Sequence, residues 1–158
     1  MSKITVGISD QKLCRSPDEL VTYALGSCVG ICLADIQAGI AGMAHIMLPD
    51  SGAVPGDGNR FKFADTAIKL LYDSMVAEGA QPSRITAKIA GGANMFGGST
   101  SLMNIGGRNI EAVRDNLNKL GIPILAEDVG LNYGRTVFFD PQSGEMTVKS
   151  GLKGTKVL

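Results

Sequence analysis

The sequence predicts an α+β domain in which mixed β-sheets form a sandwich and helices pack on one side. Three observations support this class. The chain has 158 residues, a length typical of one domain with a substantial core. Its 21 glycines and many short apolar runs indicate strands joined by tight turns. Two longer segments have the apolar spacing of amphipathic helices. We therefore expect residues 1–158 to form a single domain.

Each predicted strand is a short apolar run bounded by Gly, Pro, Asp or Asn. Eight such runs occur, at about 3–8, 20–24, 29–35, 39–48, 84–90, 122–129, 135–140 and 145–149. The first helix is predicted over about 60–78, because apolar residues recur there at helical spacing up to Gly79. The second is predicted over about 107–120, where the same spacing ends before Gly121 and Pro123.

Charge and hydropathy exclude two classes of partner. Fifteen basic and fifteen acidic residues cancel, so the chain lacks the positive footprint of a nucleic-acid-binding protein. No apolar run approaches the ~20 residues that span a bilayer, and the first residues lead into a strand without a signal-peptide core. We expect a cytoplasmic protein with no nucleic-acid partner and no direct membrane insertion.

The three cysteines suggest neither a disulfide framework nor a metal site. Cys14, Cys28 and Cys32 are odd in number and none is arranged as C-x-x-C, so we expect no metal. Cys32 lies within an apolar run and is expected to be a small buried hydrophobe. Cys14 lies in a loop-like stretch and carries no predicted function.

Cys28 is the candidate nucleophile because of the residues before it. Gly26 permits a sharp turn with positive φ, which would present the thiol at the rim of a sheet. The backbone N–H groups of Ser27 and Cys28 would then be free to hold an oxyanion. The Ser27 hydroxyl is the weaker nucleophile near neutral pH.

His45 is the only histidine, so any Cys–His chemistry must use it as the base. It lies in a predicted strand, with Met43 on its own face and Ala44 on the other. A neighbouring imidazolium would hold Cys28 as the reactive thiolate. The other reading stays open: a buried histidine that hydrogen bonds to backbone.

Two residues could orient His45. The Thr22 hydroxyl or carbonyl could accept the imidazole N–H and fix the tautomer, although Thr22 could equally be a β-branched strand residue. Asp50 follows His45 by five positions, past the predicted turn. The loop 49–60 that contains Asp50 and Ser51 is either an active-site flap with substrate contacts or a surface excursion.

The glycine-rich segment 90–98 does not predict a nucleotide site. It matches neither G-x-G-x-x-G nor the P-loop pattern, and no lysine follows it. Its backbone is instead expected to pass close to its own sheet or to a partner chain. Phe96, with Met95 beside it, is then the predicted apolar anchor for a partner.

Five short motifs, in order along the chain, resemble the chemoreceptor glutamine deamidase (CheD) family. They are Thr22-x-x-Leu25-Gly26-Ser27-Cys28, Met43-Ala44-His45-x-Met47-Leu48-Pro49-Asp50-Ser51, Gly91-Gly92-Ala93-x-Met95-Phe96, Ile105-Gly106-x-Arg108-Asn109 and Gly134-Arg135. The resemblance implies a cysteine hydrolase domain related to that of cytotoxic-necrotizing-factor toxins. It also implies a triad of Cys28 as nucleophile, His45 as general base and then acid, and Thr22 as the orienting member.

The same resemblance implies that the substrates are glutamine side chains on the cytoplasmic helices of methyl-accepting chemotaxis receptors. Glutamyl methyl esters are a second implied substrate, and no cofactor is implied. An alternative is a regulatory module that binds receptors or a CheC-type chemotaxis phosphatase through Phe96. A hydrolase of small amides lacks support, because no compact apolar pocket can be identified from the sequence.

Overall fold

The computed structural model describes residues 1–95 and 104–158, which form two five-stranded sheets and two α-helices. The elements in order are β1 (Lys3–Thr5), β2 (Asp10–Arg15), β3 (Glu19–Leu25), β4 (Val29–Asp35), β5 (Ile40–Ile46), α1 (Ala64–Ala77), β6 (Thr86–Gly91), α2 (Ile105–Lys119), β7 (Ile124–Val129), β8 (Arg135–Phe139), β9 (Met146–Ser150) and β10 (Gly154–Val157). Short 3₁₀ turns cover Ser51–Ala53 and Pro82–Arg84.

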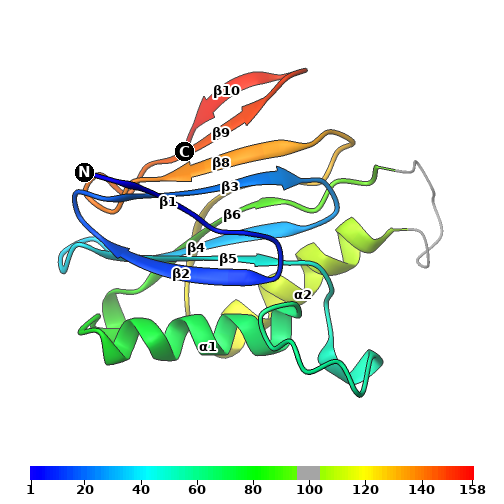
Figure 1. The fold of residues 1–158 in the computed structure, drawn as a ribbon, viewed down its shortest axis with the longest axis horizontal. Helices are drawn as coiled ribbons and strands as arrows, with labels where there is room; N and C mark the ends of the chain where they lie inside the picture. The colour runs from blue at the N-terminus through cyan, green and yellow to red at the C-terminus, as the bar shows by residue number, and fades with distance from the viewer. Residues whose placement is uncertain (96–103) are drawn as a thin grey trace.

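The two sheets are stacked, and both helices cover the outer face of one of them (Figure 1). Sheet A has the strand order β1-β3-β8-β9-β10, and sheet B has the order β2-β5-β4-β6-β7. Each sheet is mixed, because β1 pairs with β3 and β6 pairs with β7 in parallel while the other pairings are antiparallel. The predicted α+β sandwich with helices on one side is confirmed.

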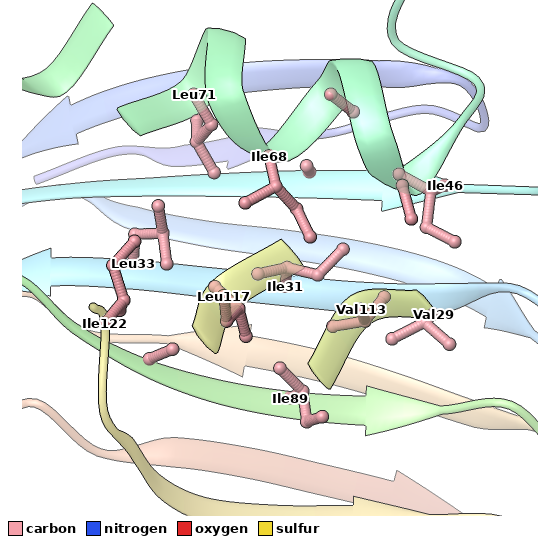
Figure 2. Close-up of a cluster of buried hydrophobic side chains, with 14 of the residues drawn as sticks. Val29, Ile31, Leu33, Ile46, Ile68, Leu71, Ile89, Val113, Leu117 and Ile122 are labelled. Atoms are coloured by element: carbon pink, nitrogen blue, oxygen red, sulfur yellow. The ribbon is translucent and has the colours of Figure 1, made fainter. Parts of the chain in front are cut away.

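Sheet B is the middle layer, so its two central strands are buried on both faces. All seven residues of β4 and all seven of β5 are buried. On β4, Val29, Ile31 and Leu33 point to the helices and pack near Leu71 and Leu117 (Figure 2). The alternate positions of β4 and β5 face sheet A. His45 belongs to this second set, and so lies between the sheets.

A buried ion pair ties the two sheets together. The Arg135 guanidinium of β8 lies 3.1 Å from the Asp128 carboxylate of β7, and its centre lies 4.3 Å from the centroid of the Tyr133 ring. Lys156 of β10 donates to the other oxygen of Asp128 at 3.2 Å. Arg135 also pairs with Leu25 across β3 and β8, so this link ends close to the segment that carries Cys28.

The structure differs from the predicted elements mainly at the sheet edges. β2 and β10 are not predicted from the sequence, and Cys14 lies in β2 rather than in a loop. Helix α1 begins at Ala64, four residues later than expected, and α2 begins two residues earlier, at Ile105. In the part of the chain that the structure describes, neither helix is long and apolar enough to cross a membrane.

Candidate active site

A chain of hydrogen bonds fixes the state of His45. The Thr22 hydroxyl oxygen lies 2.7 Å from the Val6 carbonyl oxygen and 2.7 Å from Nδ1 of His45, and both side chains are fully buried. A carbonyl can only accept, so the single hydroxyl proton goes to Val6. Thr22 must then accept the proton of Nδ1. The neutral imidazole therefore carries its lone pair on Nε2, the atom that a general base needs.

Nε2 of His45 is available for chemistry. It is buried, and it has no hydrogen-bond partner among residues 1–95 and 104–158. Burial lowers the pKa of His45 from its ordinary 6.5 to about 4, so the ring is neutral at neutral pH. A buried polar atom without a partner is uncommon and calls for an explanation. A role as proton acceptor supplies one.

Strand register brings Cys28 to the same face as His45. Gly30 of β4 is the direct partner of His45 of β5, and paired residues share a face. Cys28 lies two positions before Gly30, so it returns to that face as a diagonal neighbour of His45. Diagonal neighbours lie about 7–8 Å apart at Cα, within reach of an imidazole ring. Cys28 packs against the apolar layer between the sheets but keeps some exposure.

The turn before Cys28 is built differently from the prediction. Gly26 does not have a positive φ; Ala24 does, at 60°, beside a register shift between Thr22 and Leu25 of β3. Such bulges commonly redirect a strand next to an active site. A Cβ at Gly26 would make only ordinary contact with the Met95 side chain, at 3.4 Å, so neither φ nor space requires glycine there.

Electrostatics at the site favour a neutral resting pair over the expected ion pair. Burial raises the pKa of the Cys28 thiol, and the residue's own backbone N–H opposes that rise. Since the pKa of His45 is lowered at the same time, thiol and imidazole are both neutral near pH 7. The thiolate–imidazolium pair expected from the sequence is therefore not the resting state of these two groups.

Two glycines hold the Cys28 segment against sheet B. Gly92 donates its N–H to the Cys28 carbonyl at 2.8 Å, and Ala93 donates to the Gly26 carbonyl at 2.9 Å. Gly91 has φ of 110°, and any Cβ there would collide with the Cys28 carbonyl oxygen. The close backbone approach predicted for this glycine-rich segment is confirmed, and it is made to the chain's own sheet.

The sequence predicts no role for Asn109, although this residue contacts the segments that carry both candidate groups. It is fully buried on α2, and its Nδ2 donates to the Ser27 carbonyl and to the Met47 carbonyl, each at 2.9 Å. A lone amide in the middle of a helix gives no sequence signal of such a role. Its place in a motif of the family resemblance is the one indication.

Of the predicted contact residues, the structure describes Asp50, Ser51 and Met95. Asp50 accepts from the Gly52 N–H at 2.8 Å, and the Ser51 hydroxyl donates to Asp65 at 2.7 Å, so both build the turn that leads to α1. Met95 is 48% exposed beside Gly26. Phe96 lies outside the described residues.

Two hollows, of about 430 and 400 Å³, flank the edge strand β2. The larger lies against α1, and the smaller lies against Ile4. Neither is lined by Cys28, His45 or Thr22. The candidate chemistry therefore lies apart from both of these hollows.

Comparison with known proteins agrees with the motifs. Residues 47–150 match the family model CheD, described as CheD chemotactic sensory transduction. That stretch contains Asn109 and Arg135 but begins just after His45. Full-length relatives cover the rest of the chain.

Three relatives are each named probable chemoreceptor glutamine deamidase CheD. The protein of Caldanaerobacter subterraneus subsp. tengcongensis is 48% identical over 98% of this chain and 97% of its own. That of Lachnoclostridium phytofermentans is 49% identical over 97% and 96%, and that of Syntrophomonas wolfei is 47% identical over the whole of both chains.

A solved structure is also similar: the Bacillus licheniformis hypothetical protein YfiH, at 17% identity and a TM-score of 0.47. The match covers 78% of this chain and 51% of that one. The likeness is distant, and the assignment rests on the family model and on the full-length relatives. This chain belongs to the CheD family.

Proposed function

We propose that this protein deamidates glutamine side chains of chemoreceptors to glutamate, with Cys28 as the nucleophile. One observation carries the proposal: the hydrogen-bond chain from Val6 through Thr22 to His45 leaves Nε2 as a free base on the sheet face that Cys28 shares. The names of the relatives, chemoreceptor glutamine deamidases, supply the substrate class.

The reaction follows the general pattern of cysteine amidohydrolases. Sγ of Cys28 attacks the carboxamide carbon while its proton passes to Nε2 of His45. The tetrahedral intermediate collapses, the C–N bond breaks, and Nε2 returns the proton to the leaving nitrogen, so ammonia departs. Water then attacks the thioester, giving its proton to Nε2, and glutamate leaves as Cys28 regains a proton from His45.

Thr22 and the backbone would support these steps. Thr22 keeps the Nδ1 proton in place, so the same nitrogen, Nε2, accepts and donates at each step. The N–H groups of Ser27 and Cys28 would hold the oxyanion, as donors of this kind do in acyl transfer. Neither N–H donates to a backbone carbonyl among the described residues, so both remain available.

A glutamyl methyl ester would pass through the same acyl-enzyme, with methanol leaving in place of ammonia. The chemistry of the triad is identical for the two substrates, so ester hydrolysis is included in the proposal. The relative rates of deamidation and ester hydrolysis would depend on how well His45 can protonate each leaving group.

The substrate would be presented on the surface of a protein. Cys28 keeps partial exposure, and exposed Met95 lies beside the turn that carries it. We therefore propose a receptor helix as the occupant, with Met95 and Phe96, and the loop carrying Asp50 and Ser51, as its contacts. This role places the protein in the cytoplasm, where the signalling helices of receptors lie.

The first experiment is peptide mass spectrometry of a chemoreceptor cytoplasmic fragment from the same genome, incubated with the protein. Wild type is expected to convert specific glutamines to glutamates, and Cys28→Ala is expected to convert none.

Thr22→Val should lower the rate of deamidation roughly tenfold to a hundredfold, because Nδ1–H loses its hydrogen-bond acceptor and the imidazole tautomer is no longer fixed. Thr22→Ser, which keeps the hydroxyl, is the matched control. Turnover by Cys28→Ala would refute the proposal.

A second candidate function is binding of receptors or of a CheC-type phosphatase without chemistry. The observation that favours it is the exposure of Met95 beside Gly26, because an exposed apolar side chain there suits a protein contact. Co-purification of the receptor fragment with Cys28→Ala, in the absence of any glutamine conversion by wild type, would favour this function.

A further inference from the structure

We infer that Asn109 is a positioning residue that aims the Cys28 backbone N–H at the oxyanion of the reaction. This inference rests on the proposed cysteine chemistry and adds a residue from a different part of the chain. Asn109 lies on α2, 81 positions after Cys28. It does not touch the reacting atoms itself, and acts through the peptide that precedes the nucleophile.

The contacts of Asn109 settle the orientation of its amide. Two carbonyl oxygens, of Ser27 and of Met47, each lie 2.9 Å from the same terminal nitrogen. Carbonyl oxygens only accept, so that atom must be the NH₂ group and both of its protons are used. Its Oδ1, by contrast, is buried without a partner in the described part of the chain. The side chain is thus held by its two donors.

Fixing the Ser27 carbonyl also fixes the Cys28 N–H. The two groups belong to one trans peptide unit, in which C=O and N–H point in opposite directions. With the carbonyl directed at Asn109, the N–H is directed away from it. That N–H belongs to the residue of the proposed nucleophile, and backbone N–H groups at such a position hold the oxyanion in acyl transfer.

The second proton of Asn109 sets the distance to the base. Met47 follows the last residue of β5 and lies two positions after His45. Since Ser27 and Met47 share one donor atom, their carbonyl oxygens cannot move apart without breaking a buried hydrogen bond. One side chain therefore holds the oxyanion donor in register with the strand that carries His45.

Two reactions of Cys28 separate this role from a purely structural one. Deamidation passes through an oxyanion, whereas alkylation by iodoacetamide displaces iodide at a saturated carbon and forms none. Both need the thiol deprotonated. Iodoacetamide will report on Cys28, because Cys14 and Cys32 are buried whereas Cys28 is partly exposed.

The test compares Asn109→Leu and the smaller Asn109→Ser with wild type in both reactions. For Asn109→Leu we expect kcat for the receptor fragment to fall by about a hundredfold or more, the loss typical of one oxyanion donor, with KM and the alkylation rate within about threefold. Asn109→Ser leaves room for a water to replace the donors and should lose less. Asn116→Leu is the matched control, because the Asn116 amide donates within α2, to the Ala112 carbonyl.

Each outcome separates this inference from the proposed function. Parallel loss of deamidation and alkylation in the Asn109 variants would mean that the amide only holds the fold, and would overturn the inference. Unchanged deamidation in folded Asn109→Leu would do the same. Turnover by Cys28→Ala would instead remove the proposed function, whatever the Asn109 variants do.

Discussion

The Thr22 hydroxyl has one proton, and the position of that proton determines what His45 can do. The Thr22 hydroxyl donates this proton to the Val6 carbonyl, so its oxygen accepts a hydrogen bond from Nδ1 of His45. The lone pair of the neutral imidazole is then on Nε2. The Val6 carbonyl contributes no side chain and leaves no trace in a sequence motif. The contact between Thr22 and His45 was predictable from the sequence, whereas the Val6 carbonyl that orients the Thr22 hydroxyl was not.

Burial of His45 makes stability depend on pH in a defined window. An unfolded histidine titrates near its ordinary 6.5, while the folded pKa is about 4. As pH falls from about 6.5 to about 4, the unfolded chain binds a proton that the folded chain does not. The free energy of unfolding should therefore drop by up to about 3 kcal/mol across that window. Urea unfolding at a series of pH values measures it.

His45→Gln is the control for that window, because glutamine does not titrate. Its stability should be nearly flat between about pH 6.5 and pH 4, where wild type loses stability. Asp35 responds to acid in a different range, since Arg84 holds the pKa of its carboxyl below the usual 3.8. An equal slope in His45→Gln and wild type would contradict the assignment to His45.

At the level of elements, the Cys28 segment is held by close packing of backbone. Gly92 lies under α2, where an added Cβ would collide with Ile110 and lie 3.0 Å from the Gly106 carbonyl oxygen. Gly121 has nearly the same φ, 71° against 68° for Gly92, but open space around it. The two glycines thus share a similar φ and differ in the space that a side chain would meet.

Alanine substitutions at Gly121 and Gly92 separate the energetic cost of positive φ from the cost of steric contact with α2. Gly121→Ala should lose about 1 kcal/mol of stability, the cost of a side chain at positive φ. Gly92→Ala should lose about 2 kcal/mol more, because the added methyl group must also displace Ile110. Urea unfolding of both variants gives the difference. Equal losses of stability in the two variants would show that Ile110 and α2 accommodate the added methyl group without cost.

Elements with a strong apolar pattern were predictable, and those without it were not. β4 and its neighbour β5 are buried along their whole length and stand out as apolar runs. β2 is an edge strand with charged residues at Asp10, Lys12 and Arg15, and every residue of β10 is exposed. Edge strands are commonly polar, so their sequences resemble loops. Asn109 was missed for a related reason: only the fold shows what a helix amide faces.

At the scale of the whole molecule, the ion pair of Arg135 and Asp128 joins the two sheets. Arg135→Met should destabilise the fold by about 3 kcal/mol, because a buried carboxylate loses its main partner. Replacing Asp128 by leucine in the same chain should recover part of that loss, since no buried charge is then left unpaired. Lys156→Met, which removes the half-exposed partner of Asp128, should cost less than about 1 kcal/mol. A double-mutant cycle by urea unfolding measures the coupling between Arg135 and Asp128. A loss of stability in Lys156→Met equal to that in Arg135→Met would contradict this ranking.

The pairing of β3 with β8 also bears on the order of synthesis. Thr22 lies opposite Val137, so its strand has no antiparallel neighbour until the ribosome has translated Val137, 115 positions later. Asn109 and Gly92 likewise emerge long after Cys28. In a growing chain, Cys28 is therefore made early, whereas the residues that hold its segment in place are made late. The native packing around Cys28 cannot form until those residues have been translated.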